Sequence, residues 1–128
     1  MIVHPAPVEQ EELGLIEGRM PDSKEEWWTA QALWKYEIPF RYQWELFGGT
    51  SRRGGLLVDF VVWNPKVTPL LVYGNYWHRN ELTGGDRVRL VAIAQYFNLS
   101  VDTIPIIWAS KSTTKEDIFQ FVRQEIAR

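Results

Sequence analysis

The feature that most constrains this chain is an acid inside an apolar run. Residues 56–63 read LLVDFVVW, so Asp59 is surrounded by aliphatic and aromatic side chains. An ionised carboxylate in apolar surroundings is costly unless a cation or a hydrogen-bond network compensates it. The run does not alternate between polar and apolar residues, which predicts a strand in the middle of a sheet covered on both faces. The fold must therefore provide a two-sided sheet and a partner for Asp59.

Periodicity and turn residues predict the order helix, three strands, helix, strand, helix. The expected helices span residues 23–37, 86–97 and a C-terminal stretch capped by Thr113 or Thr114. The expected strands span residues 40–47, 56–63, 70–73 and 104–108. A three-stranded meander followed by a helical crossover gives a mixed sheet with helices on its faces, which is an α/β fold.

Three buried faces follow from the same patterns. In the first helix, Ser23 and Glu26 form a capping box, and Glu26 also lies four residues before Ala30, on the side expected to be buried. That side should also include Leu33 and Trp34. The strand at 40–47 alternates, which places Phe40, Tyr42, Trp44 and Leu46 on one face. The second helix should turn Leu90, Ile93, Ala94 and Phe97 inward.

Composition limits the classes of protein. The chain has 128 residues, a net charge of −2 and no cysteine, so one domain without disulfides or thiolate metal sites is expected, and a cytoplasmic location is the natural prediction. The longest apolar runs are about eight residues, far short of the ~20 that span a bilayer, which predicts no membrane segment. The slight negative charge argues against a generally basic nucleic-acid binder but leaves a local basic groove open.

Four side chains are candidates for chemistry: Glu26, Asp59, His78 and Asp86. Carboxylates such as Asp59 suit Mg²⁺, which keeps several waters and binds through one or two carboxylates. His78 has the type of side chain that takes a proton near neutral pH. Structural interpretations stay open: Glu26 caps a helix, Asp86 suits a helix start, and Asp59 accepts backbone hydrogen bonds.

Basic and aromatic side chains near these candidates suggest contacts to DNA. Arg52 and Arg53 lie in a glycine-rich connection where they could meet phosphates, and Arg79 follows His78. Trp77 could stack on a base or fill the core. The two histidines lack the spacing of a zinc site, and no Walker-type phosphate loop occurs.

Taken in order, these residues resemble two groups of nucleases. The segments SKEE at 23–26, IPFRYQ at 38–43, VDF at 58–60 and GNYWH at 74–78 resemble the very short patch repair endonucleases and the related EDxHD homing endonucleases. Both groups belong to the PD-(D/E)XK, or restriction-endonuclease-like, superfamily. The resemblance covers roughly residues 22–110, and its most specific part is GNYWH. It implies an αβββαβ core within one nuclease-like domain at 22–128. The weak periodicity of residues 1–21 separately predicts an N-terminal arm.

The resemblance also implies roles for individual residues. Asp59 would ligate Mg²⁺ or Mn²⁺, the backbone carbonyl of Val72 would be the second protein ligand, and Glu26 would support a metal-bound water. His78 would be the general base and Asp86 the last acid of the EDxHD pattern. The implied activity is endonucleolytic hydrolysis of DNA by an enzyme of the phage or mobile-element kind, acting as a homodimer or with a partner protein.

One departure from the superfamily pattern keeps a second function open. The wider superfamily carries E-x-K or E-x-Q on the second strand of the hairpin, where this chain has Leu71 and Tyr73. A site that works through His78 tolerates the loss of the acid and the lysine. The alternative is a catalytically inactive nuclease-fold module that binds nucleic acid or a protein partner.

Overall fold

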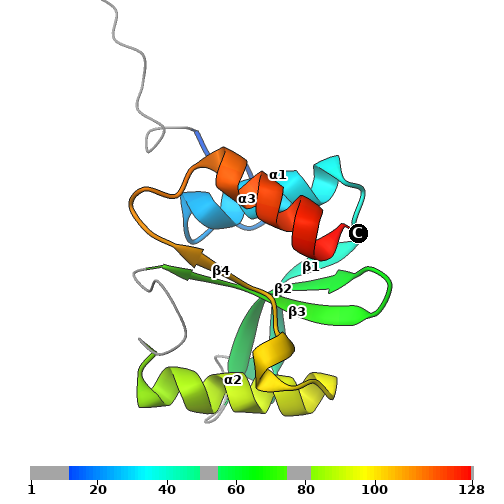
Figure 1. Ribbon diagram of the computed structural model, residues 1–128, viewed down its shortest axis with the longest axis vertical. Helices are drawn as coiled ribbons and strands as arrows, with labels where there is room; N and C mark the ends of the chain where they lie inside the picture. The colour runs from blue at the N-terminus through cyan, green and yellow to red at the C-terminus, as the bar shows by residue number, and fades with distance from the viewer. Residues whose placement is uncertain (1–11, 50–54, 75–81, 128) are drawn as a thin grey trace, which may run out of the picture.

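A four-stranded mixed sheet with helices on both faces forms the centre of the computed structural model (Figure 1). The structure describes residues 12–49, 55–74 and 82–127. Helices α1 and α3 cover one face, and α2 covers the other. The α/β fold class and the mixed sheet predicted from the sequence are confirmed. Within the described ranges, no helix is both long and apolar enough to cross a membrane.

The order of the elements also agrees with the prediction. The elements are α1 (Lys24–Lys35), β1 (Phe40–Leu46), β2 (Leu56–Trp63), β3 (Val67–Gly74), α2 (Gly84–Phe97), the 3₁₀ turn η4 (Val101–Thr103), β4 (Ile106–Ala109), α3 (Lys115–Phe121) and the π-helical turn η5 (Val122–Ile126). Each helix begins where a hydroxyl side chain accepts a backbone N–H: Ser23 for α1, Thr83 for α2 and Thr114 for α3. These caps satisfy N–H groups that a helix start leaves unpaired.

The sheet contains a fork, the opening where β2 and β3 separate. The two strands pair antiparallel only from Trp63 and Val67 to Phe60 and Leu70. Beyond that point β3 pairs in parallel with β4, starting at Leu71. The strand order is β1-β2-β3-β4, so β2 stays beside β1 while β3 moves to β4. Asp59 is the first residue of β2 on the open side of this separation.

Both β1 and β2 change faces next to the fork. Residues two apart on a strand normally face the same side, yet Phe60 packs with α1 and α3 whereas Val58 packs with α2. On β1, Tyr42 and Trp44 divide between the two sides in the same way. The predicted common face of the strand at 40–47 is therefore wrong. Gln43 adopts a left-handed backbone conformation with φ 54°, which turns the strand at this row.

Two apolar cores result from this arrangement. The first joins α1 and α3 to the sheet and includes Trp28, Leu33 and Ile118. The second joins α2 to the sheet and includes Leu90 and Ile93. The expected inward position of Trp34 is wrong: its side chain is 47% exposed and packs edge-on against Trp27, with ring centroids 5.8 Å apart.

The described part of the N-terminal arm packs along the edge strand β1. Ile16 is fully buried in the first core. The turn after it brings the Glu17 carboxylate to the backbone N–H of Tyr42, at 2.5 Å, and to the Arg41 guanidinium, at 3.2 Å. The side chain of Glu17 thus fills a hydrogen-bonding position on β1 that a neighbouring strand would otherwise fill.

Gly49 and Gly55 flank residues 50–54, and a substitution at Gly55 tests how closely their backbones approach each other. A Cβ at Gly55 would lie 1.6 Å from the carbonyl oxygen of Gly49, so two backbone segments approach too closely for any side chain. We expect Gly55→Ala to lower the free energy of unfolding by about 2 kcal/mol or more. Gly84→Ala is the matched control, because among the described residues nothing beyond its chain neighbours and its own helix lies within 4 Å of the added methyl.

Urea unfolding followed by circular dichroism measures both variants. Alanine at Gly84 should leave stability unchanged or raise it by up to roughly 1 kcal/mol, since alanine favours a helix. Equal stabilities for the two variants would contradict the close approach at Gly55.

Candidate active site

The carboxylate of Asp59 takes the place of a missing strand partner at the fork. Its Oδ2 accepts the backbone N–H of Val72 at 2.8 Å. The neighbouring N–H of Leu71 donates in the opposite direction, to the carbonyl of Pro105 at 3.2 Å. Because the N–H and C=O of one strand residue point to the same side, the carbonyl of Val72 also points toward β2. The fork thus directs a carboxylate and a backbone carbonyl into the same opening.

A second acid reaches this region from α1. Glu26 is 7% exposed, as its position in the helix predicted, and its Oε1 accepts the hydroxyl of Tyr42 at 2.6 Å. The Tyr42 oxygen in turn accepts the backbone N–H of Asp22 at 3.2 Å and Nε2 of Gln43 at 3.3 Å. Since both donors point at the oxygen, the Tyr42 proton is directed toward Glu26.

Burial raises the pKa of both acids, and the Asp59 carboxylate adds to the rise at Glu26. Burial raises the pKa of Glu26 from 4.5 to about 7, and the nearby Asp59 carboxylate adds to the rise, while the hydrogen bond from Tyr42 opposes it. Burial also raises the pKa of Asp59, against the lowering effects of the Val72 N–H and the Arg89 guanidinium. The Asp22 carboxylate acts on both groups and raises both pKa values. Paired acids with raised pKa values in one region are typical of functional sites.

Arg89 places a positive charge beside these acids from the opposite face of the sheet. It extends from α2, donates from Nη2 to the carbonyl of Leu57 on β2, and lowers the pKa of Asp59 through its charge. Its Nε is buried and has no hydrogen-bond partner within the described part of the chain. A buried guanidinium N–H without a partner is costly. The group could therefore bind an additional anion at the fork.

The structure brings together some of the predicted site residues. Glu26 and Asp59 meet at the fork, where Val72 also lies. Asp86 forms a capping box with Thr83 at the start of α2: its Oδ2 accepts the Thr83 N–H at 3.3 Å. His78, the predicted general base, lies outside the described residues, as do the predicted DNA-binding residues Arg52, Arg53, Arg79 and Trp77.

Sequence reasoning missed Asp22, Tyr42 and Arg89 as parts of this site. Arg89 carried a detectable signal, because it lies three residues after Asp86 and four before Ile93, on the inward side of α2. Tyr42 was predicted to be inward, but nothing in the strand pattern indicates that its hydroxyl meets Glu26. Asp22 gives no local signal, since it precedes the cap of α1 and acts only through the folded arrangement.

Comparisons with known proteins identify no relative of this chain: no family model, curated protein or solved structure matches it. Among residues 12–49, 55–74 and 82–127, no group of three or more His, Cys, Asp or Glu side chains is arranged to hold a metal ion.

The cost of burying Glu26 gives a prediction about stability and pH. Between pH 4.5 and about 7 the folded protein holds a proton that the unfolded chain has lost, so the free energy of unfolding falls as pH rises through this range. Glu26→Gln removes this fall in stability, because glutamine does not ionise. Its side-chain oxygen can still accept the Tyr42 hydroxyl. At pH 8 the variant should be more stable than the wild type, by up to about 3 kcal/mol.

Thermal unfolding at pH 5 and pH 8 measures this difference. At pH 5 the advantage of Glu26→Gln should largely disappear, because the wild-type side chain is then also neutral. Glu45→Gln is the control, since it makes the same change at an exposed acid on β1. A Glu26→Gln variant that is less stable than the wild type at pH 8 would indicate that the ionised acid stabilises the fold.

Proposed function

We propose that this protein is a Mg²⁺-dependent endodeoxyribonuclease with a restriction-endonuclease-like core. The observation that carries the proposal is the placement of Glu26 near Asp59 at the fork: burial raises both pKa values, and the Asp59 carboxylate adds to the rise at Glu26. Carboxyl groups kept where they are costly are expected at sites that bind a cation or handle protons. The proposal is strengthened by the order αβββαβ and by a parallel β3–β4 pair beyond an antiparallel meander, as the sequence resemblance implied.

The donor atoms at the fork fit a hard divalent cation. Asp59 offers a carboxylate and Val72 a backbone carbonyl on the same side, and Glu26 is close enough for the Asp59 carboxylate to raise its pKa. Mg²⁺ binds in this way, through one or two carboxylates with water and substrate phosphate as its other ligands. When bound, such an ion supplies acidification of water and neutralisation of charge on the phosphate.

The remaining roles belong to side chains of this chain. Glu26, oriented by Tyr42, would hold a water by hydrogen bonding beside Asp59. His78 would take the proton from the attacking water. Arg89 would donate its unpartnered Nε–H to a phosphate oxygen, a contact that strengthens as negative charge builds up there. DNA would be held by Arg52, Arg53, Arg79 and Trp77.

One observation favours a non-catalytic alternative. The charge of Arg89 already compensates Asp59 in part, so the acid does not strictly require a metal ion. The lysine of the superfamily motif is also replaced, by Tyr73. In this alternative the protein is an inactive nuclease-fold module, and the acid, Arg89 and the Val72 amide hold the fork together. DNA or partner binding would then be independent of divalent cations.

A plasmid-nicking assay separates the two functions. Wild-type protein with Mg²⁺ or Mn²⁺ should convert supercoiled plasmid to nicked or linear DNA, and a chelator should stop it. Asp59→Asn should reduce cleavage to background, and His78→Ala should slow it by about 100-fold or more. Asp102→Asn, which changes an exposed acid on η4, should cleave like the wild type.

The outcome that contradicts the enzyme is equally specific. If no plasmid, branched or mismatched DNA is cleaved, while DNA binding by mobility shift is unaffected by chelator and by Asp59→Asn, the inactive module is the correct assignment. Cleavage that persists in Asp59→Asn would remove the fork from the mechanism.

Metal binding can be measured separately from cleavage. Mg²⁺ should raise the melting temperature of the wild type at pH 8, and more so at higher Mg²⁺ concentration, because a ligand that binds only the folded state stabilises it. The shift should be smaller at pH 6, because a proton on Glu26 removes negative charge from the site; its pKa is about 7. Asp59→Asn should show no shift, and Asp102→Asn should show the full one.

A further inference from the structure

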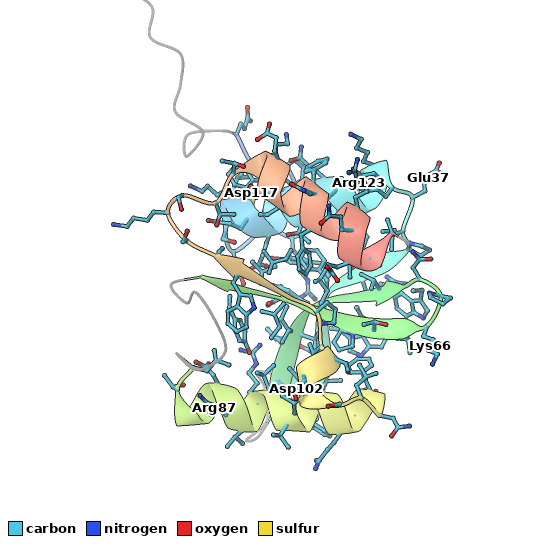
Figure 2. The ribbon with its side chains drawn as sticks, in the orientation of Figure 1. Glu37, Lys66, Arg87, Asp102, Asp117 and Arg123 are labelled. Carbon is cyan, nitrogen blue, oxygen red and sulfur yellow. The ribbon has the colours of Figure 1, made fainter. Side chains whose placement is uncertain are left out.

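A shallow pocket of about 430 Å³ lies between the end of α1 and the C-terminal helix. The residues of its lining that matter here are Lys35, Tyr36, Lys115, Glu116, Phe119 and Arg123. None of them belongs to the candidate active site. Figure 2 shows Arg123 in the helical layer that lies across the sheet from α2 and Arg87.

The pocket concentrates positive charge on an otherwise acidic chain. Three cations, Lys35, Lys115 and Arg123, line it together with one acid, Glu116, which gives a formal charge of 3 − 1 = +2. The whole chain has a net charge of −2. A concave, positively charged surface attracts anions and raises their local concentration.

Two of these cations approach the same aromatic ring. The ammonium of Lys35 lies 5.5 Å and that of Lys115 lies 5.8 Å from the centroid of Phe119. The ring attracts each cation weakly, by ~0.5–1 kcal/mol at an exposed site. Gathering like charges around one ring also makes them repel each other, and an anion bound between them would relieve that repulsion.

Arg123 reaches the pocket from a rare backbone conformation. It lies in η5, the π-helical turn that directly continues α3, where the N–H of Ala127 donates to the carbonyl of Val122 at 2.8 Å. Such turns are uncommon in proteins and occur frequently at functional sites. The turn is therefore a second, independent feature of this pocket that is typical of functional sites.

We propose that this pocket binds a phosphate group. A phosphate monoester carries up to two negative charges and three acceptor oxygens, which match the formal charge of +2 and the several N–H donors of the pocket. A carboxylate would satisfy only half of that charge. The two charges could come from one phosphate monoester of a small compound or from two adjacent phosphodiesters of a DNA backbone that crosses the α1–α3 layer, each of which carries a single charge. The inference goes beyond the proposed cleavage at the fork and does not require it.

The test is an NMR titration of the full chain in the presence of a metal chelator, so that binding of cations at the fork cannot contribute. One arm adds sodium pyrophosphate and the other adds a short DNA duplex, both at low ionic strength. Backbone amide signals of Lys35, Phe119 and Gln120 should shift in a saturable manner in at least one arm. Sodium chloride at matched ionic strength should not reproduce the shifts.

Paired variants make the assignment specific. Lys35→Ala combined with Lys115→Ala should weaken binding by at least about tenfold, since two charge-assisted contacts are lost. Lys66→Ala combined with Lys111→Ala removes the same charge from exposed turns outside the pocket and should retain the wild-type affinity; Figure 2 shows Lys66 at the β2–β3 turn. Circular dichroism verifies that both pairs are folded.

Each outcome has a defined meaning. Saturable shifts at the pocket with pyrophosphate support a small phosphate compound, and shifts with duplex alone support a DNA backbone. The proposal is overturned if neither arm shifts these residues or if the two variant pairs lose affinity equally. Because the metal is chelated throughout, either result leaves the nicking assay as an independent test of the fork.

Discussion

The hydrogen bond from the Val72 amide to the Asp59 carboxylate is the interaction on which the centre of the molecule depends. At that point β3 leaves β2 and joins β4, so the amide would otherwise face an opening in the sheet. A carboxylate is a stronger acceptor than a peptide carbonyl, and it closes the gap without a strand. Because a carboxylate stands where a neutral carbonyl would be, it also places a negative charge at the fork. The groups around it act on that charge.

Those surroundings compensate the charge only in part. Arg89 approaches from α2 and the Val72 N–H from β3, yet burial still leaves the pKa of Asp59 raised. Burial and, after it, the charge of the Asp59 carboxylate raise the pKa of Glu26 to about 7. A purely structural site would be expected to avoid buried, incompletely compensated carboxylates. Proteins keep such locally unfavourable features mainly where function requires them. This conflict is the main physical reason for placing the chemistry at the fork.

The basic pocket differs from the fork in its location and in the sign of its charge. The fork lies within the sheet and gathers acids, whereas the pocket lies on the outer side of the α1–α3 layer and gathers cations. Each assignment relies on the geometry of its own residues. The two sites share no lining residue, so evidence for or against one does not decide the other.

The sequence by itself determined the elements, their order and, apart from Trp34, the buried side of α1, because caps and apolar spacing act over a few residues. It also singled out Glu26 and Asp59, since an acid among apolar residues is conspicuous in any context. Only the tertiary structure decided the face change at Gln43, the exposure of Trp34, and the meeting of Tyr42 with Glu26 and of Arg89 with Asp59. Those contacts join residues 16 and about 30 positions apart, and they depend on strand register and helix placement, which no local pattern encodes.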